Sequence, residues 1–207
     1  MGTHMQRQRA PHFQLEGGIL CLDFVNTLDD RPSDAPKELV NSYADLLRFG
    51  EDTGILGPSE ADALMERSQA SPKEAERVLG SAIELREAMY AIFWALVKRQ
   101  SVPEKALAQL NGYVQDAGRH SCLVESKRRF EWQFEETSSF DAILWPIARS
   151  AADLLASEQR VFVRACSSKT CRWLFLDSSK NHRRRWCSMK LCGNRTKVRR
   201  FYARQKA

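Results

Sequence analysis

The 207-residue sequence lacks any apolar run long enough to cross a bilayer. Its longest unbroken apolar segment is AMYAIFWALV, residues 88–97, whereas a membrane-spanning helix needs about 20 apolar residues. No charged segment followed by an apolar one opens the chain, so we expect a cytoplasmic protein without a membrane anchor. The first five residues, MGTHM, look like an expression scar and are excluded from the fold prediction.

Sequence motifs of common enzyme classes are also absent. The chain contains neither a glycine-rich phosphate loop nor an H-E-x-x-H motif. His12 and His120 have no Ser or Cys partner motif, and the paired acids Glu135 and Glu136 are typical of a solvated face. We therefore expect a globular protein that is not an enzyme.

Acidic residues are almost missing from the last quarter of the chain. Residues 161–207 contain 14 Lys and Arg and a single acid, Asp177, a formal charge of +13. Residues 1–160 contain 18 basic and 25 acidic residues, a formal charge of −7. Opposite charges suggest two functional parts, and a strongly basic part predicts an anionic partner, most often nucleic acid.

Helical periodicity dominates residues 6–159, which we predict to form one mostly helical domain. The segment 17–36 begins with the first apolar run and is predicted as a short strand or helical turn followed by a loop. Helices are expected over 37–54, 58–69, 72–99, 102–118 and 138–159, the last kinked near Pro146. Alternation around a basic turn predicts a hairpin at 121–137. The expected fold class is mainly α with small β elements (α+β).

Residues 160–207 are predicted to form a separate treble-clef-like ββα module. Short strands are expected at 160–165, 173–177 and 182–187, and a final helix at 188–206.

Four of the six cysteines form two equally spaced pairs, Cys166-x4-Cys171 and Cys187-x4-Cys192. In a reducing compartment such a cluster indicates a metal more often than disulfides. Four thiolates suit tetrahedral zinc and leave no open coordination position, so we expect one structural zinc per chain. Two disulfides, or His182 replacing one ligand, remain alternatives. Isolated Cys21 and Cys122 are interpreted as buried cysteines in apolar strands.

Basic residues surround the cysteine pairs. A helix over 188–206 would place Lys190, Lys197, Arg200 and Arg204 on one stripe, suited to nucleic-acid phosphates in a major groove. The candidate nucleic-acid-binding residues are Arg183, Arg184, Arg185, Lys190, Arg195, Lys197, Arg199, Arg200 and Arg204.

Two alternatives stay open for this basic stripe. It is either a solvated face or a surface that neutralises the acidic N-terminal part. In addition, Arg185 or Arg195 is a candidate to pair with Asp177, the lone acid of residues 161–207. An apolar stripe on the same helix is expected to pack on the metal centre; it contains Leu191, Val198, Phe201 and Tyr202. Trp173 and Trp186 are expected mainly to pack.

A small-molecule effector pocket is a further hypothesis for the N-terminal part. Polar residues flank its first apolar run and meet an arginine of the long helix; the candidates are Asp23, Asn26, Thr27, Arg31 and Arg86. The alternative, which the residue types favour, is capping and turn chemistry.

The C-terminal motif C-W-L-F-L-D-S-S-x-N-x-x-R-R-W-C-S-M-x-x-C-G-N-R-x-K, written without the residue between its first Cys and Trp, resembles the bacterial CGNR zinc-finger family. The segments GGILCLDFVNTLDDRP, LREAMYAIF and LWPIARSAADLL resemble the ABATE domain that usually precedes it. The resemblance implies zinc ligands at Cys166, Cys171, Cys187 and Cys192. It also implies a stress-related, DNA-binding transcription regulator. A protein-docking or RNA-binding module is the alternative. Separately, the helical domain is expected to serve in sensing or in dimerisation, which would make the protein a homodimer.

Overall fold

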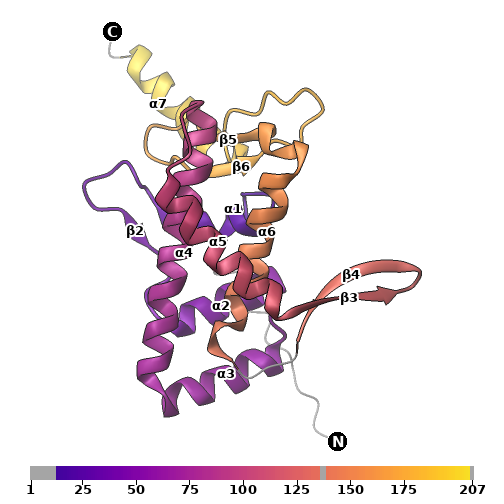
Figure 1. The fold of residues 1–207 in the computed structure, drawn as a ribbon. Helices are drawn as coiled ribbons and strands as arrows, with labels where there is room; N and C mark the ends of the chain where they lie inside the picture. The colour runs from indigo at the N-terminus through magenta and orange to yellow at the C-terminus, as the bar shows by residue number, and fades with distance from the viewer. Residues whose placement is uncertain (1–12, 136–138, 206–207) are drawn as a thin grey trace, which may run out of the picture.

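The computed structural model describes residues 13–135 and 139–205, and Figure 1 shows its arrangement. The first elements are α1 (Leu20–Val25), a two-stranded ribbon of β1 (Leu28–Asp29) and β2 (Lys37–Glu38), α2 (Tyr43–Thr53) and α3 (Pro58–Ala70). The first apolar run is thus a helix. The helix expected from residue 37 begins at Tyr43, because residues 37–38 pair with β1 and Ser42 caps the first turn by accepting from Asp45 N.

The 27-residue helix α4 (Pro72–Lys98) is the longest element and confirms the strongest helix prediction. Its proline stands in the first turn, where the missing N–H has no helical partner to lose. One face buries residues from Ala75 to Ala95 against α1, α2, α5 and α6. In the described part of the chain, no helix is both long and apolar enough to span a membrane.

Helices α5 (Glu104–Arg119) and α6 (Leu144–Ala156) complete the main core beside α4. A 3-10 turn, η1 (Phe140–Ile143), precedes α6, so Pro146 falls in the first turn of the helix rather than at a kink in its middle. The hairpin expected between α5 and α6 in the sequence is confirmed; its strands are β3 (Ser121–Ser126) and β4 (Arg129–Phe134). Figure 1 shows it extending away from the helices.

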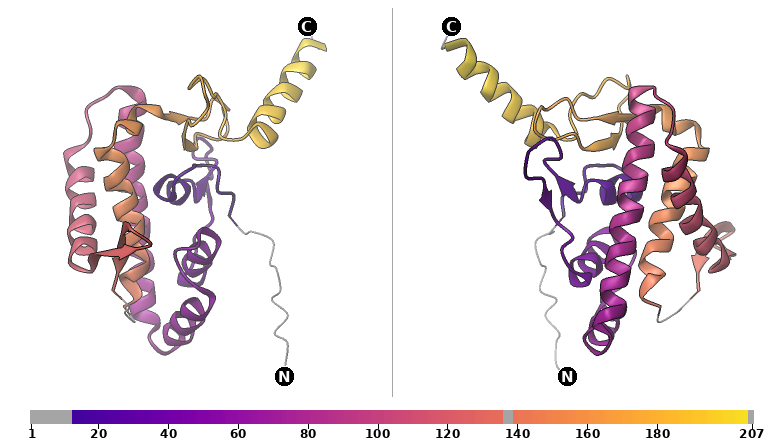
Figure 2. Two further views of the ribbon diagram at one scale, coloured as in Figure 1. Left: turned by 90° about the vertical axis from the view of Figure 1, so that its right-hand side faces the viewer. Right: turned by 60° about the vertical axis from the view of Figure 1, so that its left-hand side comes forward.

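The cysteine-rich part follows a second 3-10 turn, η2 (Glu158–Phe162). It comprises an antiparallel pair, β5 (Val163–Ala165) and β6 (Leu174–Leu176), a single π-helical turn, η3 (Met189–Gly193), and the helix α7 (Asn194–Gln205). The third strand expected at 182–187 is wrong, because these residues form bends and extended backbone outside any ladder in the described chain. Figure 2 shows α7 projecting from the body.

The projection of α7 overturns the predicted packing of its apolar stripe on the metal centre. Val198 and Tyr202 are 53% and 59% exposed, and Leu191 is half-buried. The side chain of Phe201 lies outside the described residues. The reason is that α7 leaves the module at its first turn and contacts chiefly the π turn before it.

The two isolated cysteines also differ from their prediction. Cys21 is fully buried, but on helix α1 instead of a strand. Cys122 does lie on a strand, β3, but it is exposed, because the hairpin stands away from the core.

Candidate metal centre and basic surface

The four paired cysteines meet in one cluster although they come from three local structures: the β5–β6 connection, the loop after β6 and the π turn η3. Cys166 directly follows β5, and Cys171 lies in the turn that leads to β6. Cys187 ends the long loop after β6, and Cys192 is in the π turn η3. All four are buried, and their Sγ atoms lie within 4.8 Å of one another.

The cluster fits tetrahedral zinc. The Sγ atom of Cys187 lies 3.7 Å from both Cys171 Sγ and Cys192 Sγ. A tetrahedron with Zn–S bonds of about 2.3 Å has sulfur–sulfur edges of about 3.8 Å. The alternatives of two disulfides and of a histidine ligand fail here: all six cysteines are free thiols, and His182 instead stacks on Phe162 at 3.8 Å.

Hydrogen bonds among the sulfurs favour the thiolate form at two of the four cysteines. Bonds with Cys171 and Cys187 lower the pKa of Cys166 to about 7. The other three cysteines, with a smaller contribution from Arg195, lower the pKa of Cys192. Bonds with Cys166 and Cys192 raise the pKa of both Cys171 and Cys187. A bound divalent cation would stabilise all four as thiolates.

The Cys-Gly-Asn-Arg sequence at 192–195 has a direct structural explanation. Arg195 Nη2 donates to Cys192 Sγ at 3.1 Å, a charge-assisted bond that orients and stabilises the ligand. A Cβ at Gly193 would lie 2.4 Å from Met189 Sδ, so a larger residue there would require the exposed Met189 side chain to move. The π turn lets the amides of Cys192 and Gly193 both donate to Ser188 O. These contacts place Cys192 at the start of α7.

Two predicted pocket residues instead fasten the helical region to the cysteine-rich module. Asn26 Nδ2 donates to Leu174 O at 2.8 Å, and Leu174 N donates back to Asn26 Oδ1 at 2.9 Å. Asp23 Oδ1 accepts from Gly17 N at 2.7 Å, while Gly17 O accepts from Leu176 N at 2.8 Å. Gly17 and Asn26 thus bind the backbone groups of β6 that β5 leaves unpaired.

The other three predicted pocket residues form a buried network beneath α4. Arg86, 3% exposed, makes a two-pronged ion pair with Glu38 and contacts Thr27 Oγ1. Arg31 makes a similar pair with Glu87 and lies 3.8 Å from the centroid of the Tyr90 ring. Each of the five candidate side chains therefore has a partner within the protein, and an effector pocket there gains no support.

Most of the predicted nucleic-acid-binding residues are exposed and not neutralised. Arg183, Arg185, Lys190, Lys197 and Arg199 are exposed, and none forms an ion pair within the described residues. The side chains of Arg200 and Arg204 lie outside the described part.

Two of the predicted basic residues have structural roles. Arg195 contacts Cys192 as described above, and Arg184 packs its guanidinium on Phe175 and donates to Trp186 O. The pairing of Arg185 or Arg195 with Asp177 is not seen. Asp177 is buried and instead accepts from Ser179 and from the backbone N–H of Arg184.

Sequence analysis missed a second basic surface at the junction of the two regions. Two neighbouring cavities of about 460 and 610 Å³ share Val97 and Arg164 as lining residues. Their walls carry six cations, Lys98, Arg99, Arg160, Arg164, Lys169 and Arg172, and among the described residues no acid lines either cavity.

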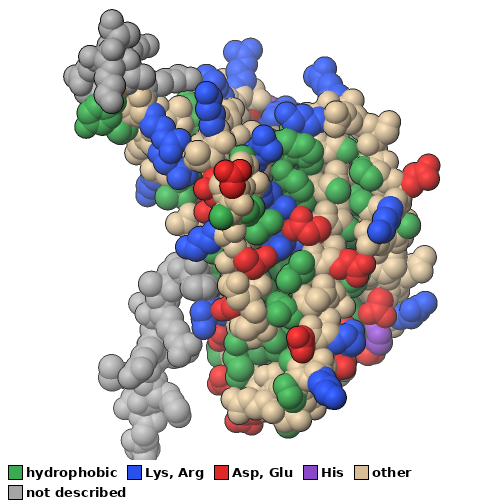
Figure 3. Space-filling view, turned by 90° about the vertical axis from the view of Figure 1, so that its left-hand side faces the viewer, with side chains coloured by type: hydrophobic (Ala, Val, Ile, Leu, Met, Phe, Trp, Pro, Cys, Tyr) green, Lys and Arg blue, Asp and Glu red, His purple; other side chains and the backbone are tan. Residues whose placement is uncertain are grey.

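These six cations come from separate parts of the sequence, namely the end of α4 and residues 160–172. Arg160 and Arg164 donate only to backbone carbonyls, so their charges stay unpaired. The sequence showed that residues 160–172 are basic. It could not show that they lie next to the end of α4, because the two segments are far apart along the chain. In Figure 3, Lys and Arg side chains gather at the end of the molecule that bears the module, with most acids elsewhere on that face.

Comparison with protein families finds two separate matches along the chain. Residues 18–158 match the ABATE family, described as "Putative stress-induced transcription regulator". Residues 163–205 match the CGNR zinc finger. No curated protein matches the chain. With the buried four-thiol cluster, the zinc-finger match identifies Cys166, Cys171, Cys187 and Cys192 as the ligands of one structural zinc.

Proposed function

The chain belongs to the ABATE family and carries a CGNR zinc finger, and on that premise we propose that it is a DNA-binding transcription regulator rather than an enzyme. The observation that carries the proposal is the unneutralised basic surface around the zinc module. It has two parts. One is the projecting helix α7. The other is the pair of adjoining cavities between the end of α4 and residues 160–172, whose walls carry six cations; we call it the six-cation groove.

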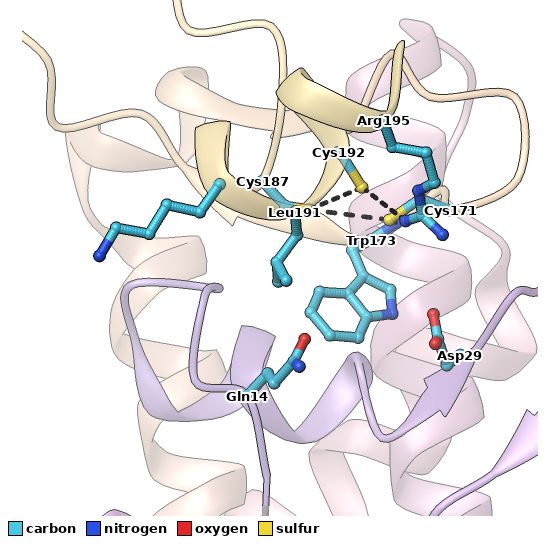
Figure 4. Close-up of a pocket in the computed structure, with 9 residues that line it drawn as sticks. Gln14, Asp29, Cys171, Trp173, Cys187, Leu191, Cys192 and Arg195 are labelled. Atoms are coloured by element: carbon cyan, nitrogen blue, oxygen red, sulfur yellow. Dashed lines mark hydrogen bonds between the residues drawn. The ribbon is translucent and has the colours of Figure 1, made fainter. Parts of the chain in front are cut away.

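Helix α7 has the form of an element that enters a groove of duplex DNA. Its 12 residues contain five Lys and Arg and no acid. At about 1.5 Å per residue it spans about 18 Å, and a helix of this width fits the major groove. Cys192 lies in the π turn η3 that leads directly into this helix (Figure 4), so zinc bound there would orient the cationic element without joining the contact.

The six-cation groove extends the same charge onto the helical region. Because Lys98 and Arg99 end α4 while Arg164 and Arg172 belong to the zinc module, phosphates bound here would contact both regions. Such contacts are sequence-independent and supply affinity that falls steeply with salt.

The test is a fluorescence-anisotropy titration of zinc-loaded protein with labelled random duplex DNA at ~50 and ~200 mM salt. We expect tight, salt-sensitive binding that chelation of zinc abolishes. The double variants Lys197→Gln/Arg199→Gln and Arg164→Gln/Arg172→Gln should each weaken binding and reduce the log–log salt slope by about 0.9 per lost phosphate contact.

The matched control is Lys73→Gln/Arg128→Gln, which removes the same charge from exposed positions far from the module. It should bind like the parent protein. Failure of the zinc-loaded protein to bind at the lower salt would refute the proposal and favour docking to an acidic protein. Stronger competition by single-stranded RNA than by duplex DNA would indicate an RNA-binding module instead.

A further inference from the structure

The β3–β4 hairpin carries an exposed apolar face. Its ladder pairs Leu123 with Trp132, and alternate side chains of each strand lie on the same side. One face therefore carries four apolar side chains, Leu123, Phe130, Trp132 and Phe134. The first three are 55%, 69% and 49% exposed, although Arg149 lies over the Trp132 ring at 3.9 Å from its centroid. Because a two-stranded hairpin is at best marginally stable in water, such an uncovered face indicates a partner.

The outer edge of β4 also lacks a partner. Among the described residues, β3 and β4 form a sheet of two strands, and β4 is six residues long. Glu135 N donates to His120 O at 2.9 Å, which makes these two residues a hydrogen-bonded pair of the ladder. Hydrogen-bonded and open pairs alternate along antiparallel strands, so the N–H and C=O groups of Phe130, Trp132 and Phe134 point away from β3. This edge is able to pair with a further strand.

The charges along β4 select the strand that fits this edge. Arg129 begins the strand, Glu131 lies near its middle, and Glu135 directly follows its end. Arg129 forms no ion pair within the described residues, and Glu135 is 54% exposed beside His120. An antiparallel second copy of β4, centred on Trp132, would place Arg129 opposite the partner's Glu135. Two-fold symmetry produces this ion pair twice.

The register centred on Trp132 satisfies the aromatic, backbone and charge patterns together. It sets Trp132 against its own copy and Phe130 against the partner's Phe134, and the backbone groups of all three point outward. Moving the centre to Glu131 or Gln133 sets acidic side chains opposite one another, which is destabilising. A centre between two residues sets outward-pointing backbone groups against inward-pointing ones, and longer shifts shorten the overlap.

We propose that the chain forms a two-fold symmetric dimer in which the outer edges of two β4 strands pair in this register. The two hairpins then form one antiparallel sheet of four strands. The outer edge of β3 fits a second copy less well, because its outward residues, Ser121, Leu123 and Glu125, include no aromatic ring and no cation. This dimer depends on neither zinc nor DNA, so its test is independent of the proposed function.

The size of the contact sets the expected affinity. A fully buried aromatic side chain covers about 150–250 Å². Three partly exposed aromatic side chains per copy therefore supply less than the roughly 800 Å² per partner of a stable complex. We expect a reversible dimer with a dissociation constant on the order of 10 µM.

The test is sedimentation velocity of the full zinc-loaded chain without DNA, from ~1 to ~200 µM. We expect a monomer that converts to a dimer over this range. Amide exchange followed by NMR at both concentrations identifies the edge. The amides of Phe130, Trp132 and Phe134 should gain protection in the dimer, whereas the outward amide of Leu123 should keep its rate.

Removal of the aromatic contacts should weaken the dimer. Phe130→Ser/Trp132→Ser should raise the dissociation constant by about tenfold or more. The matched control is Val161→Ser/Val198→Ser, which removes apolar side chains of similar exposure, 58% and 53%, outside the hairpin. It should dimerise like the parent protein. Circular dichroism checks that both variants keep the helical fold.

Charge reversal tests the register. Arg129→Glu sets acids opposite one another and should raise the dissociation constant about tenfold. Arg129→Glu/Glu135→Arg should restore it. Because Glu135 also contacts His120 within the chain, Glu135→Arg is measured alone and should weaken the dimer as well. Lys105→Glu, at an exposed position at the other end of α5, is the control for charge and should have no effect.

Three results would overturn the proposal. The first is a monomer at ~200 µM. The second is a dimer that Phe130→Ser/Trp132→Ser leaves unchanged, which would place the interface elsewhere. The third is a dimer in which the double charge reversal does not restore association, or in which the amides of β4 gain no protection, because either would exclude this pairing of β4.

Discussion

The helical region and the zinc module are stabilised in different ways. Among the described residues, the main core contains 31 buried side chains, most of them from α1–α6 and the β5–β6 pair. The second core contains six, four of which are the cysteines. Burial of large apolar side chains, at about 1.5–3 kcal/mol each, can stabilise the first core. The second has too few of them, so the metal must supply most of its folding free energy.

The comparison also shows that the boundary between these cores does not coincide with the change in sequence composition. Val163 and Leu174 of the β5–β6 pair belong to the main core, whereas Phe175 faces the cysteines. One strand therefore contributes alternate residues to both cores, as the period of two requires. Val163 and Leu174 therefore anchor the β5–β6 pair of the module in the core of the helical region.

The largest expected effect comes from removing a zinc ligand. Cys187→Ala should abolish zinc binding, because it removes one of the four ligands. The module then loses the free energy that structural zinc supplies, about 10–16 kcal/mol in small modules. We expect residues 178–205 to become sensitive to limited proteolysis, while the β5–β6 pair stays protected by the main core. Zinc content and mass spectrometry of the fragments measure both.

The control for this variant is Cys122→Ala, which removes an exposed thiol on β3 and should retain one zinc per chain. Full zinc retention by Cys187→Ala, or protection of the whole chain without zinc, would show that the two cores are not stabilised differently.

A smaller effect is expected at the junction. Asn26→Ala should lower the free energy of unfolding by about 2–4 kcal/mol, because it leaves the buried N–H and C=O of Leu174 without partners. Urea unfolding followed by circular dichroism measures the loss. Asn41→Ala, at an exposed position, is the control. Equal stability of the two variants would mean that the side chain of Asn26 does not couple the regions.

The smallest effect is a pH dependence at the same junction. Burial raises the pKa of Asp23 from 3.8 to about 6, with a smaller contribution from Glu16. The folded state therefore binds the proton more tightly than the unfolded state, and the stability that protonated Asp23 contributes is lost as the pH rises from about 4 to 6. The linked free energy is at most about 2–3 kcal/mol.

Asp23→Asn removes this titration and keeps an oxygen that accepts from Gly17 N. We expect the variant to gain stability relative to the parent protein as the pH rises from 4 to 6, by about 1–2 kcal/mol at pH 7. Taking the difference between the two proteins cancels the acid-induced loss of zinc that they share. A constant difference across this pH range would contradict a raised pKa.

Local patterns in the sequence were sufficient to predict most helices and the metal site. The periodicity of 72–99 and the Pro-Ser start at 58 predicted α4 and α3, and the alternation at 121–137 predicted the hairpin. The two Cys-x4-Cys pairs predicted the zinc ligands, because metal coordination requires particular atoms whatever the path of the chain. The third strand at 182–187 was wrong, since a strand needs a partner that the sequence does not specify.

The helices, the zinc ligands and the opposite charges of the two parts are therefore properties that the sequence alone predicts. Tertiary structure alone decided that Asn26 pairs with β6 and that Lys98 and Arg164 share a groove. The two groups of properties differ in how far apart along the chain the residues that determine them lie. Periodicity and ligand spacing act between neighbours along the chain, whereas hydrogen-bond satisfaction and charge neutralisation depend on residues that meet only after folding.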